Sequence, residues 1–321
     1  MSEDAGNALD SGRNLIKSGH PHKLYGKEGA HMSKRTDGAR RASNIVHALK
    51  CPVCGNPVRV EEGGRLQCRE SHSFDFAKQG YVNVLTRPAA GHYNKELFEA
   101  RRRIMRDSGL YAPFHEAAAD LIREFHVPAS APSVIADIGC GEGTHLHRVL
   151  EELSGLNVAG AGLDIAKEGV QLAARDFQNA VWLVGDLAQS PFADGSINTI
   201  LNILSPSNYE EFTRMLAPGG RLIKVVPGAG YLKELRETLY SDERRTYSNE
   251  ETTGLFDRNF RRTETIPLRY SVRLGRAQLE DLVRMTPLSW SPDPEAVRNF
   301  LARESAEITV ELDLLVGEPN D

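Results

Sequence analysis

The chain has 321 residues, of which 40% are hydrophobic and 26% are charged, a mixture typical of a globular protein with room for one large domain and a smaller module. Its formal net charge of −5 excludes a surface that is basic all over but leaves room for a local basic patch. No apolar run is long enough to cross a bilayer and no apolar signal core follows the acidic start, so we expect a cytoplasmic protein.

Residues 1–48 are rich in Gly, Ser, Asn, His and Lys and show little apolar periodicity, so we predict a flexible basic tail. Basic side chains outnumber acidic ones near its end, where Asp37 stands against Lys34, Arg35, Arg40, Arg41 and Lys50. Two interpretations stay open. The segment is either a basic arm that contacts nucleic-acid phosphates or a solvated tail without a function of its own.

Next comes a cysteine and histidine pattern. Cys51 and Cys54 form C-x-x-C, and Cys68 and His72 follow as C-x-x-x-H after a spacer long enough for a small hairpin. Three thiolates and one imidazole fill the four positions of a structural zinc site and leave none for water. We therefore predict one structural Zn²⁺ in a zinc-binding module at residues 49–86. A redox C-x-x-C is the alternative, and the downstream Cys and His disfavour it.

Two segments after the cysteines have an open role. Residues 74–85 combine aromatic and amide side chains, which either stack on an unpaired base or form the small core of the module. Residues 96–109 predict a helix within a helical linker at 87–130. This helix carries a basic cluster of Arg101, Arg102, Arg103 and Arg106. The cluster either contacts RNA phosphates or belongs to a solvated helix paired with its own acids.

From residue 131 to 317 short apolar runs alternate with helical patterns, which is typical of a doubly wound α/β fold with a parallel sheet. A helix at 114–125 leads into this domain. We predict strands at 133–138, 158–163, 181–185, 197–203 and 221–226. We predict helices between them at 144–154, 167–178, 208–216 and 231–240.

The C-terminal part has weaker patterns. Residues 241–267 are polar and charged, and we predict loop and short helix there. Residues 276–285 predict a helix. The apolar alternation at 308–316 predicts a final strand, which fits an antiparallel hairpin at the edge of the sheet.

The first strand of this domain ends in Asp137 and leads into a glycine-rich turn, Gly139-Cys140-Gly141-Glu142-Gly143, before a helix. A strand, a tight turn and a helix N-terminus are how α/β sheets build nucleotide-type pockets. Glycines lack a Cβ, so the backbone can turn sharply and a ligand can come close. The motif alone is weak, since many such matches are only structural turns.

Two further acids favour one ligand. Asp164 ends the second strand, where a carboxylate can accept both hydroxyls of a ribose, and Asp186 follows the third, where it can accept from an adenine amino group. Asp164 as an ordinary helix N-cap is the alternative. The whole stretch resembles the S-adenosylmethionine (SAM) site of class I methyltransferases, which implies a doubly wound, seven-stranded sheet.

Together and in this order, the motifs resemble the RlmA family of 23S ribosomal RNA guanine-N1 methyltransferases. The resemblance covers about residues 50–317 and rests on the cysteine and histidine pattern, 72–75, 77–83, 137–143, 162–164, 285–287 and Trp290. It implies that the zinc-binding module at 49–86 helps to recognise RNA. It also implies a homodimer with a cleft for an rRNA hairpin, and a guanine of helix 35 as the substrate. Residues 202–209 look more like the Gram-positive branch, which is linked to resistance against tylosin and related macrolides.

The resemblance also assigns residues. Cys51, Cys54, Cys68 and His72 match the zinc ligands of the family. Tyr111, Gly141 and Glu142 match positions that contact SAM. Tyr231 falls where some members carry a histidine that touches SAM, and Asp186 comes from strand order more than from the family.

For the chemistry, the loop after the fourth strand lies where class I enzymes present the substrate atom. We predict that Asn202 orients the guanine through its carbonyl and that Ser205 bonds to its edge, while the N1 proton passes to water or a backbone carbonyl. Two other functions stay open. One is methylation of a small molecule, and the other is a non-catalytic RNA-binding protein that keeps SAM as a structural ligand.

Overall fold

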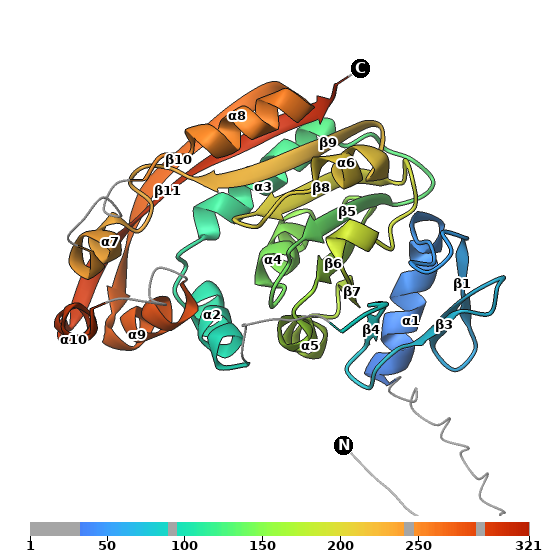
Figure 1. Cartoon of the computed structure of the whole chain (residues 1–321), viewed down its shortest axis with the longest axis horizontal. Helices are drawn as coiled ribbons and strands as arrows, with labels where there is room; N and C mark the ends of the chain where they lie inside the picture. Colours follow the sequence, from blue (N-terminus) through green and yellow to red (C-terminus); the bar gives the residue numbers. More distant parts are fainter. Residues whose placement is uncertain (1–32, 89–94, 241–246, 287–292, 321) are drawn as a thin grey trace, which may run out of the picture. The chain divides into compact units, whose positions relative to one another are not determined.

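The computed structural model describes residues 33–88, 95–240, 247–286 and 293–320. In this part of the chain one sheet has eight strands in the order β10-β11-β9-β8-β5-β6-β7-β4, and a smaller sheet has the order β1-β2-β3 (Figure 1). The strands of the large sheet are β4 (Tyr81–Asn83), β5 (Ser133–Ile138), β6 (Val158–Asp164), β7 (Ala180–Val184), β8 (Ile197–Ile203), β9 (Leu216–Pro227), β10 (Phe260–Gly275) and β11 (Ser305–Pro319).

The centre of the large sheet is parallel, as the sequence predicts. β5 pairs with β6 and β8, β6 pairs with β7, and β8 pairs with β9, all in the parallel sense. All five predicted strands are present. The chain order reverses at β5, with β6 on one side and β8 on the other, and open α/β sheets bind ligands at such a point.

Helices cover both faces of this sheet, and each face has its own core. In β5, Ile135 packs into one cluster, while Val134 and Ala136 pack into the other, as expected for alternating side chains of a strand buried on both faces. None of the described helices is long and apolar enough to span a membrane. The helices are α1 (Lys34–Asn44), α2 (Lys95–Asp107), α3 (Ala112–Phe125), α4 (Thr144–Glu152), α5 (Lys167–Asp176), α6 (Tyr209–Met215), α7 (Lys233–Leu239), α8 (Glu250–Asn259), α9 (Arg276–Met285) and α10 (Pro294–Leu301).

The C-terminal hairpin is longer than predicted. β10 pairs with β11 along its whole length and β11 pairs with β9, both antiparallel. The prediction of loop and short helix at 241–267 is therefore wrong for residues 260–267, which belong to β10. This strand lies at the sheet edge and is exposed at most positions, so it carries little apolar alternation. Pro267 is tolerated there because an edge strand has unpaired N–H positions.

The predicted flexible tail also ends too late. Residues 34–44 form α1, with Ser33 as its N-cap, and Gly38, Ala39 and Ala42 are buried. A Cβ at Gly38 would lie 2.3 Å from the carbonyl oxygen of Gly80, so small residues let this helix touch the backbone. Small side chains give little apolar periodicity, which is why the pattern misses the helix. Residues 1–32 of the predicted tail lie outside the described residues.

The zinc-binding segment contributes to both sheets. β1 (Val58–Glu61), β2 (Arg65–Cys68) and β3 (Ser73–Asp75) form the small antiparallel sheet. β4 follows directly and pairs in parallel with β7 at the edge of the large sheet. The large sheet therefore has eight strands in the described residues rather than the seven predicted, because the cysteine-rich segment supplies one of them.

Candidate active site

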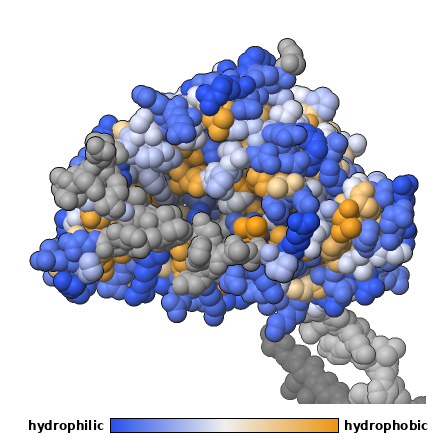
Figure 2. Space-filling view, in the orientation of Figure 1, coloured by the Kyte–Doolittle hydropathy of each residue, from blue (hydrophilic) through white to orange (hydrophobic). Residues whose placement is uncertain are grey.

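Two cavities meet at the carboxyl ends of the parallel strands. The first cavity has a volume of about 270 Å³ and is lined by Gly139, Gly141, Asp164 and Asp186 among others. The second cavity has a volume of about 450 Å³ and lies along β9. Ser205 and Pro206, in the loop after β8, line both cavities. Figure 2 shows this face of the molecule hollowed near its centre, with apolar surface beside the hollow.

The glycine turn between β5 and α4 forms the floor of the first cavity. Gly139, Gly141 and Gly143 have φ angles of +85°, +55° and +84°, which side chains rarely adopt. A Cβ on Gly139 would lie 2.0 Å from Oγ of Ser205, so the turn packs directly against the loop after β8. The turn and the loop that sequence patterns single out separately are therefore one unit.

Asp164 fixes the glycine turn and faces the first cavity. Its two carboxylate oxygens accept the N–H groups of Gly141 and Ala166, both at 2.7 Å. Each oxygen keeps a further lone pair for a ligand. The N-cap position of α5 is taken by Ala166, so Asp164 is not an N-cap of this helix. Burial raises the pKa of Asp164, against the opposing effect of the two N–H groups.

Asp186 lines the same cavity from the end of β7. Its Oδ1 accepts the N–H of Ala188 at 2.9 Å and begins a short 3-10 helix at residues 187–189. Both acids that strand order predicted therefore lie in one cavity with the glycine turn.

Asp137 and Glu142 line neither cavity and are almost completely buried. Neither carboxylate oxygen of Asp137 has a hydrogen-bond partner among the described residues. Burial raises the pKa of Asp137 to about 8, with Arg101 acting in the opposite direction. Glu142 accepts from both the N–H and the hydroxyl of Thr144, and its Oε1 lies 3.6 Å from Nε of Arg101.

Arg101 has a position that the sequence pattern does not predict. The pattern groups it with its helix neighbours as a contact for RNA or solvent, and in the structure it lines both cavities. Of the neighbouring arginines, Arg102 pairs with Asp176. Arg103 donates two hydrogen bonds to Asp281, at 2.9 and 2.6 Å. The helix α2 is thus a wall of the site and more than a linker, since it packs between α5 and α9.

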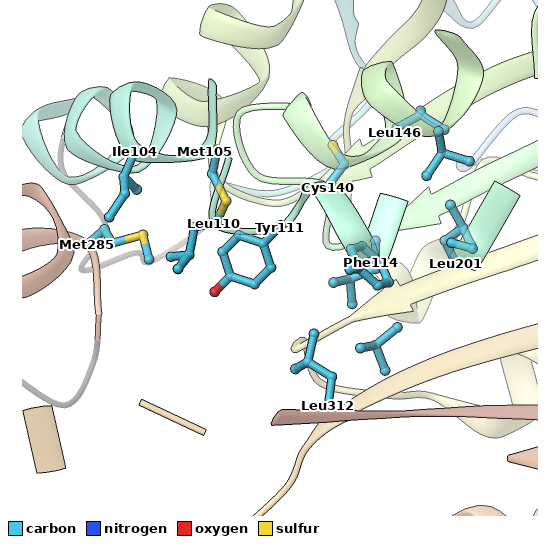
Figure 3. Close-up of a cluster of buried hydrophobic side chains, with 14 of the residues drawn as sticks. Ile104, Met105, Leu110, Tyr111, Phe114, Cys140, Leu146, Leu201, Met285 and Leu312 are labelled. Carbon is cyan, nitrogen blue, oxygen red and sulfur yellow. The ribbon is translucent and has the colours of Figure 1, made fainter. Parts of the chain in front are cut away.

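Two tyrosines close the second cavity. The hydroxyls of Tyr111 and Tyr231 form a hydrogen bond with each other, and both rings line the cavity. Figure 3 shows Tyr111 within the buried cluster that includes Met105, Leu110 and Phe114. Burial raises the pKa of both hydroxyls, so both stay protonated at neutral pH.

Asn202 holds the loop after β8. Its amide nitrogen donates to the carbonyl oxygens of Ile138 and Pro206, at 2.9 and 3.1 Å. Its Oδ1 accepts from the hydroxyl of Ser207 at 2.9 Å and from Nζ of Lys224 at 2.6 Å. The predicted direct contact of Asn202 with a guanine is therefore not what the structure provides, since the amide is fully used inside the protein.

Ser205 stays a candidate for direct contact because it lines both cavities. The preceding residue, Leu204, has a φ of +50°, which is strained for a branched side chain. Strained backbone at the junction of two cavities is typical of functional loops. Lys224 of β9, which donates to the carbonyl oxygen of Ser205, was missed because a single lysine within an apolar strand carries no motif.

The four predicted zinc ligands converge. Their ligand atoms all lie within 4.8 Å of one another. Nδ1 of His72 lies 3.6 Å from Sγ of Cys51 and 3.5 Å from Sγ of Cys68, and Sγ of Cys54 lies 3.7 Å from Sγ of Cys68. A zinc tetrahedron with the usual bond lengths has edges of about 3.8 Å between sulfurs and about 3.5 Å between sulfur and nitrogen. The site therefore fits one Zn²⁺, with His72 bound through Nδ1.

The aromatic segment after the zinc ligands is mainly core. Phe76 and Phe74 pack in one core cluster and Tyr81 is buried in the other, which favours the packing interpretation over base stacking. Much of the predicted basic arm also contacts the protein. Arg41 donates to the carbonyl oxygen of Ala180, and the side chains with protein partners further include Lys34, Arg35 and Lys50.

Two family models match the chain. The model described as RlmA, N-terminal, matches residues 49–89, and the model described as Methyltransferase domain matches residues 135–220. The first match covers the four convergent zinc ligands. The second covers the glycine turn, Asp164 and Asp186. Pro287 and Trp290, which also entered the resemblance, lie outside the described residues.

Three curated relatives align over most of their own lengths. YxjB of Bacillus subtilis (strain 168), provisionally named a 23S rRNA (guanine-N(1)-)-methyltransferase, is 41% identical over 84% of this chain and 96% of its own. The 23S rRNA (guanine(748)-N(1))-methyltransferase of Streptomyces fradiae is 37% identical over 83% and 92%. A Micromonospora griseorubida protein, provisionally named for the same guanine-N1 activity, is 32% identical over 83% and 95%.

Proposed function

Because the chain belongs to the RlmA family of 23S rRNA guanine-N1 methyltransferases, we propose that it transfers the methyl group of SAM to N1 of a guanine in the helix 35 hairpin of 23S rRNA. The observation that carries this proposal is the meeting of the two cavities at Ser205 and Pro206. A ligand in the first cavity and a base in the second would face each other across this loop.

The residues around the first cavity fit SAM, which supplies an electrophilic methyl group on a sulfonium when bound. The half-buried carboxylate of Asp164 has lone pairs for the ribose hydroxyls, and Asp186 can accept from the adenine amino group. The guanidinium of Arg101 suits the ligand carboxylate. The unpartnered carboxyl of Asp137 suits the ligand ammonium, since a buried acid without a partner gains most from a cation.

The second cavity suits a single purine. Its volume of about 450 Å³ and its lining by Tyr111, Tyr231 and Met285 offer an apolar slot for a flat ring. N1 lies on the Watson–Crick edge of guanine, so the base has to be unpaired or flipped to reach the loop after β8. A hairpin-loop guanine satisfies this requirement with little unpairing. Ser205 is placed to bond to the base edge.

The zinc module is the part that favours RNA over a small acceptor. A small-molecule methyltransferase needs the SAM cavity but no zinc ribbon, and this ribbon joins the catalytic sheet through β4. We propose that the module helps to recognise the rRNA hairpin. We also propose a homodimer that works in the cytoplasm and in which a cleft holds the hairpin. Resistance to tylosin-like macrolides is a further part of this proposal, supported by the branch that residues 202–209 resemble.

Labelled SAM tests the reaction class. We would incubate the protein with 23S rRNA from a strain that lacks this modification and, separately, with small acceptors such as quinones. Incorporation into the rRNA alone is the expected result. Label in a small acceptor alone would favour the small-molecule enzyme. SAM that is bound but never turned over would favour a non-catalytic RNA-binding protein.

A further inference from the structure

Lys224 is a buried lysine at the second cavity. It lies within the apolar run Leu222–Val226 of β9, and only 4% of it is exposed. Its Nζ lies 2.6 Å from Oδ1 of Asn202 and 2.5 Å from the carbonyl oxygen of Ser205. Lys224 lines the second cavity beside the loop that joins the two cavities. Burial of an amine costs free energy, so its fixed position at this cavity suggests that Lys224 has a function there.

The surroundings of Lys224 make its ammonium easier to deprotonate than that of an exposed lysine. No carboxylate lines the second cavity in the part of the chain that the structure describes. The charged and titratable groups that line it with Lys224 are Arg101 of α2, Arg236 of α7, Tyr111, Tyr231 and Tyr247. On the neighbouring strand β11, Asp313 lies opposite Val226 in the strand register, and its carboxylate accepts a hydrogen bond from the side-chain amide of Asn249. Burial without a counter-charge lowers the pKa of Lys224 to about 8.

The two hydrogen bonds decide where the lone pair lies. A neutral amine has two N–H donors and one lone pair, and the oxygens of Asn202 and Ser205 take both donors. The lone pair is then left for an acid. We propose that the neutral amine of Lys224 is the general base that takes the N1 proton of the guanine. This inference rests on the proposed function and adds the base that the reaction needs.

The step balances without any further reactant. N1 of the guanine gives its proton to Nζ of Lys224 and uses its electron pair to form the bond to the methyl carbon. The carbon–sulfur bond breaks and its pair stays on sulfur, which gives neutral S-adenosylhomocysteine. The positive charge of the sulfonium ends on Lys224 as an ammonium. This ammonium returns its proton to water before the next turnover.

Asn202, whose amide is fully hydrogen-bonded, positions the amine of Lys224. Because its amide nitrogen is fixed by two backbone carbonyls, its Oδ1 holds Nζ of Lys224 in one position. Asn202 is therefore a positioning residue for the base and does not touch the guanine. Asn202→Ala should lower turnover through Lys224, with a pH profile shifted from that of the wild type, because loss of an acceptor changes the pKa of the amine.

Substitutions at Lys224 separate a base from a fixed cation. Lys224→Arg keeps a positive charge but cannot lose a proton, and Lys224→Met keeps the length without the amine. We expect both to lower the single-turnover methylation rate by about 10²–10⁴-fold, which is the usual contribution of a general base. SAM affinity should stay unchanged in both. Lys167→Arg, an exposed lysine on α5, is the matched control and should keep the wild-type rate.

The pH profile and amine rescue add independent readouts. The single-turnover rate of the wild type should rise with pH, reach half of its maximum near pH 8 and level off at higher pH, as the amine of Lys224 becomes neutral. This rise should be absent in Lys224→Met. Small primary amines should restore part of the rate of Lys224→Ala, and more basic amines should restore more. Rescue also shows that the variant is folded.

The outcomes that overturn the general base differ from those that overturn the proposed function. A Lys224→Arg variant that keeps the wild-type rate would overturn the base and leave the methyltransferase intact. A wild-type protein that methylates no guanine N1 would instead overturn the proposed function. Titration of the Lys224 side chain by NMR in ¹³C-lysine-labelled protein, assigned with Lys224→Met, needs no substrate. A pKa near that of a free lysine would overturn the proposal by itself.

Discussion

At the scale of single residues, Asp137 combines full burial with a carboxyl group that has no partner among the described residues. Its pKa in the folded protein is about 8, above its usual value of 3.8. The raised pKa means that its contribution to stability is complete below about pH 4 and is lost as pH rises to about 8. Asp137→Asn cannot ionise. We expect the stability of this variant relative to the wild type, without SAM, to grow by about 4 kcal/mol between pH 5 and pH 8, measured by urea unfolding.

The same substitution should weaken SAM binding. Loss of a hydrogen bond to a charged group is worth about 1.5–3 kcal/mol, so we expect about 10- to 150-fold lower affinity for Asp137→Asn. Calorimetry in two buffers of different ionisation enthalpy reports the proton that the wild type releases when SAM binds at pH 7. The Asn variant should release none. Equal proton release by both proteins would show that Asp137 does not meet the ligand cation.

Arg101 and Arg106 lie on the same helix and offer a matched pair. Arg101 lines both cavities, whereas Arg106 is exposed and pairs only with its neighbour Asp107 among the described residues. We expect Arg101→Met to raise the dissociation constant of SAM by about 10- to 100-fold, since a charged contact is lost. Arg106→Met should leave it unchanged. Equal SAM affinity of both variants would contradict a contact between Arg101 and SAM.

At the scale of elements, α1 is held against the end of the zinc-binding segment. A Cβ at Gly38 would lie 2.3 Å from the carbonyl oxygen of Gly80, so Gly38→Ala forces two backbones apart. Overpacking of this kind destabilises by about 1–3 kcal/mol. We expect a lower midpoint of thermal unfolding for Gly38→Ala and no loss for Ser43→Ala, an exposed change on the same helix. An unchanged midpoint for Gly38→Ala would mean that α1 does not dock there.

The ligand set implies that the number of zinc ions per chain depends on three of the four cysteines. We expect one zinc per chain in the wild type and almost none in Cys68→Ser, measured by elemental mass spectrometry of the dialysed protein. Cys140 is buried in the glycine turn, outside the cluster of ligands, so Cys140→Ala should keep its zinc. Loss of zinc from Cys140→Ala, or its retention by Cys68→Ser, would contradict this ligand set.

The sequence predicts some elements much better than others, and burial explains the difference. β5 and β8 are buried on both faces and read as apolar runs, so their bounds agree with the prediction. β10 is an exposed edge strand, and α1 buries only glycine and alanine, so neither has an apolar pattern to find. Pairing with β11 and contact with Gly80 determine these two elements, and both contacts are distant in sequence.

The residues of the site also differ in how well the sequence predicts them. The glycine turn, Asp164 and Asp186 follow from local motifs and strand order, and the structure places them in one cavity. Arg101 and Lys224 come from a helix and a strand far apart in the sequence, and only folding brings them to the same cavity. Their roles depend on burial and on partners. Residue type alone could not reveal either.

At the scale of the whole molecule, the zinc-binding segment and the catalytic sheet share one hydrogen-bonded strand. β4 follows the zinc ligands and extends the sheet beside β7, whose end carries Asp186. The zinc-binding segment is therefore tied to the strand that borders the SAM cavity. This connection supports the account in which a metal-stabilised RNA-recognition element and a methyl-transfer site serve the same substrate.

Primer extension across helix 35 would show directly whether the protein methylates N1 of a guanine there. We would methylate 23S rRNA that lacks the modification with the purified protein and SAM, and then copy it with reverse transcriptase. Methylation at N1 removes a Watson–Crick donor and blocks copying. We expect one new stop, next to a single guanine of the hairpin loop, that requires both SAM and the protein. Full-length copying through helix 35, with label incorporated elsewhere or nowhere, would contradict this expectation.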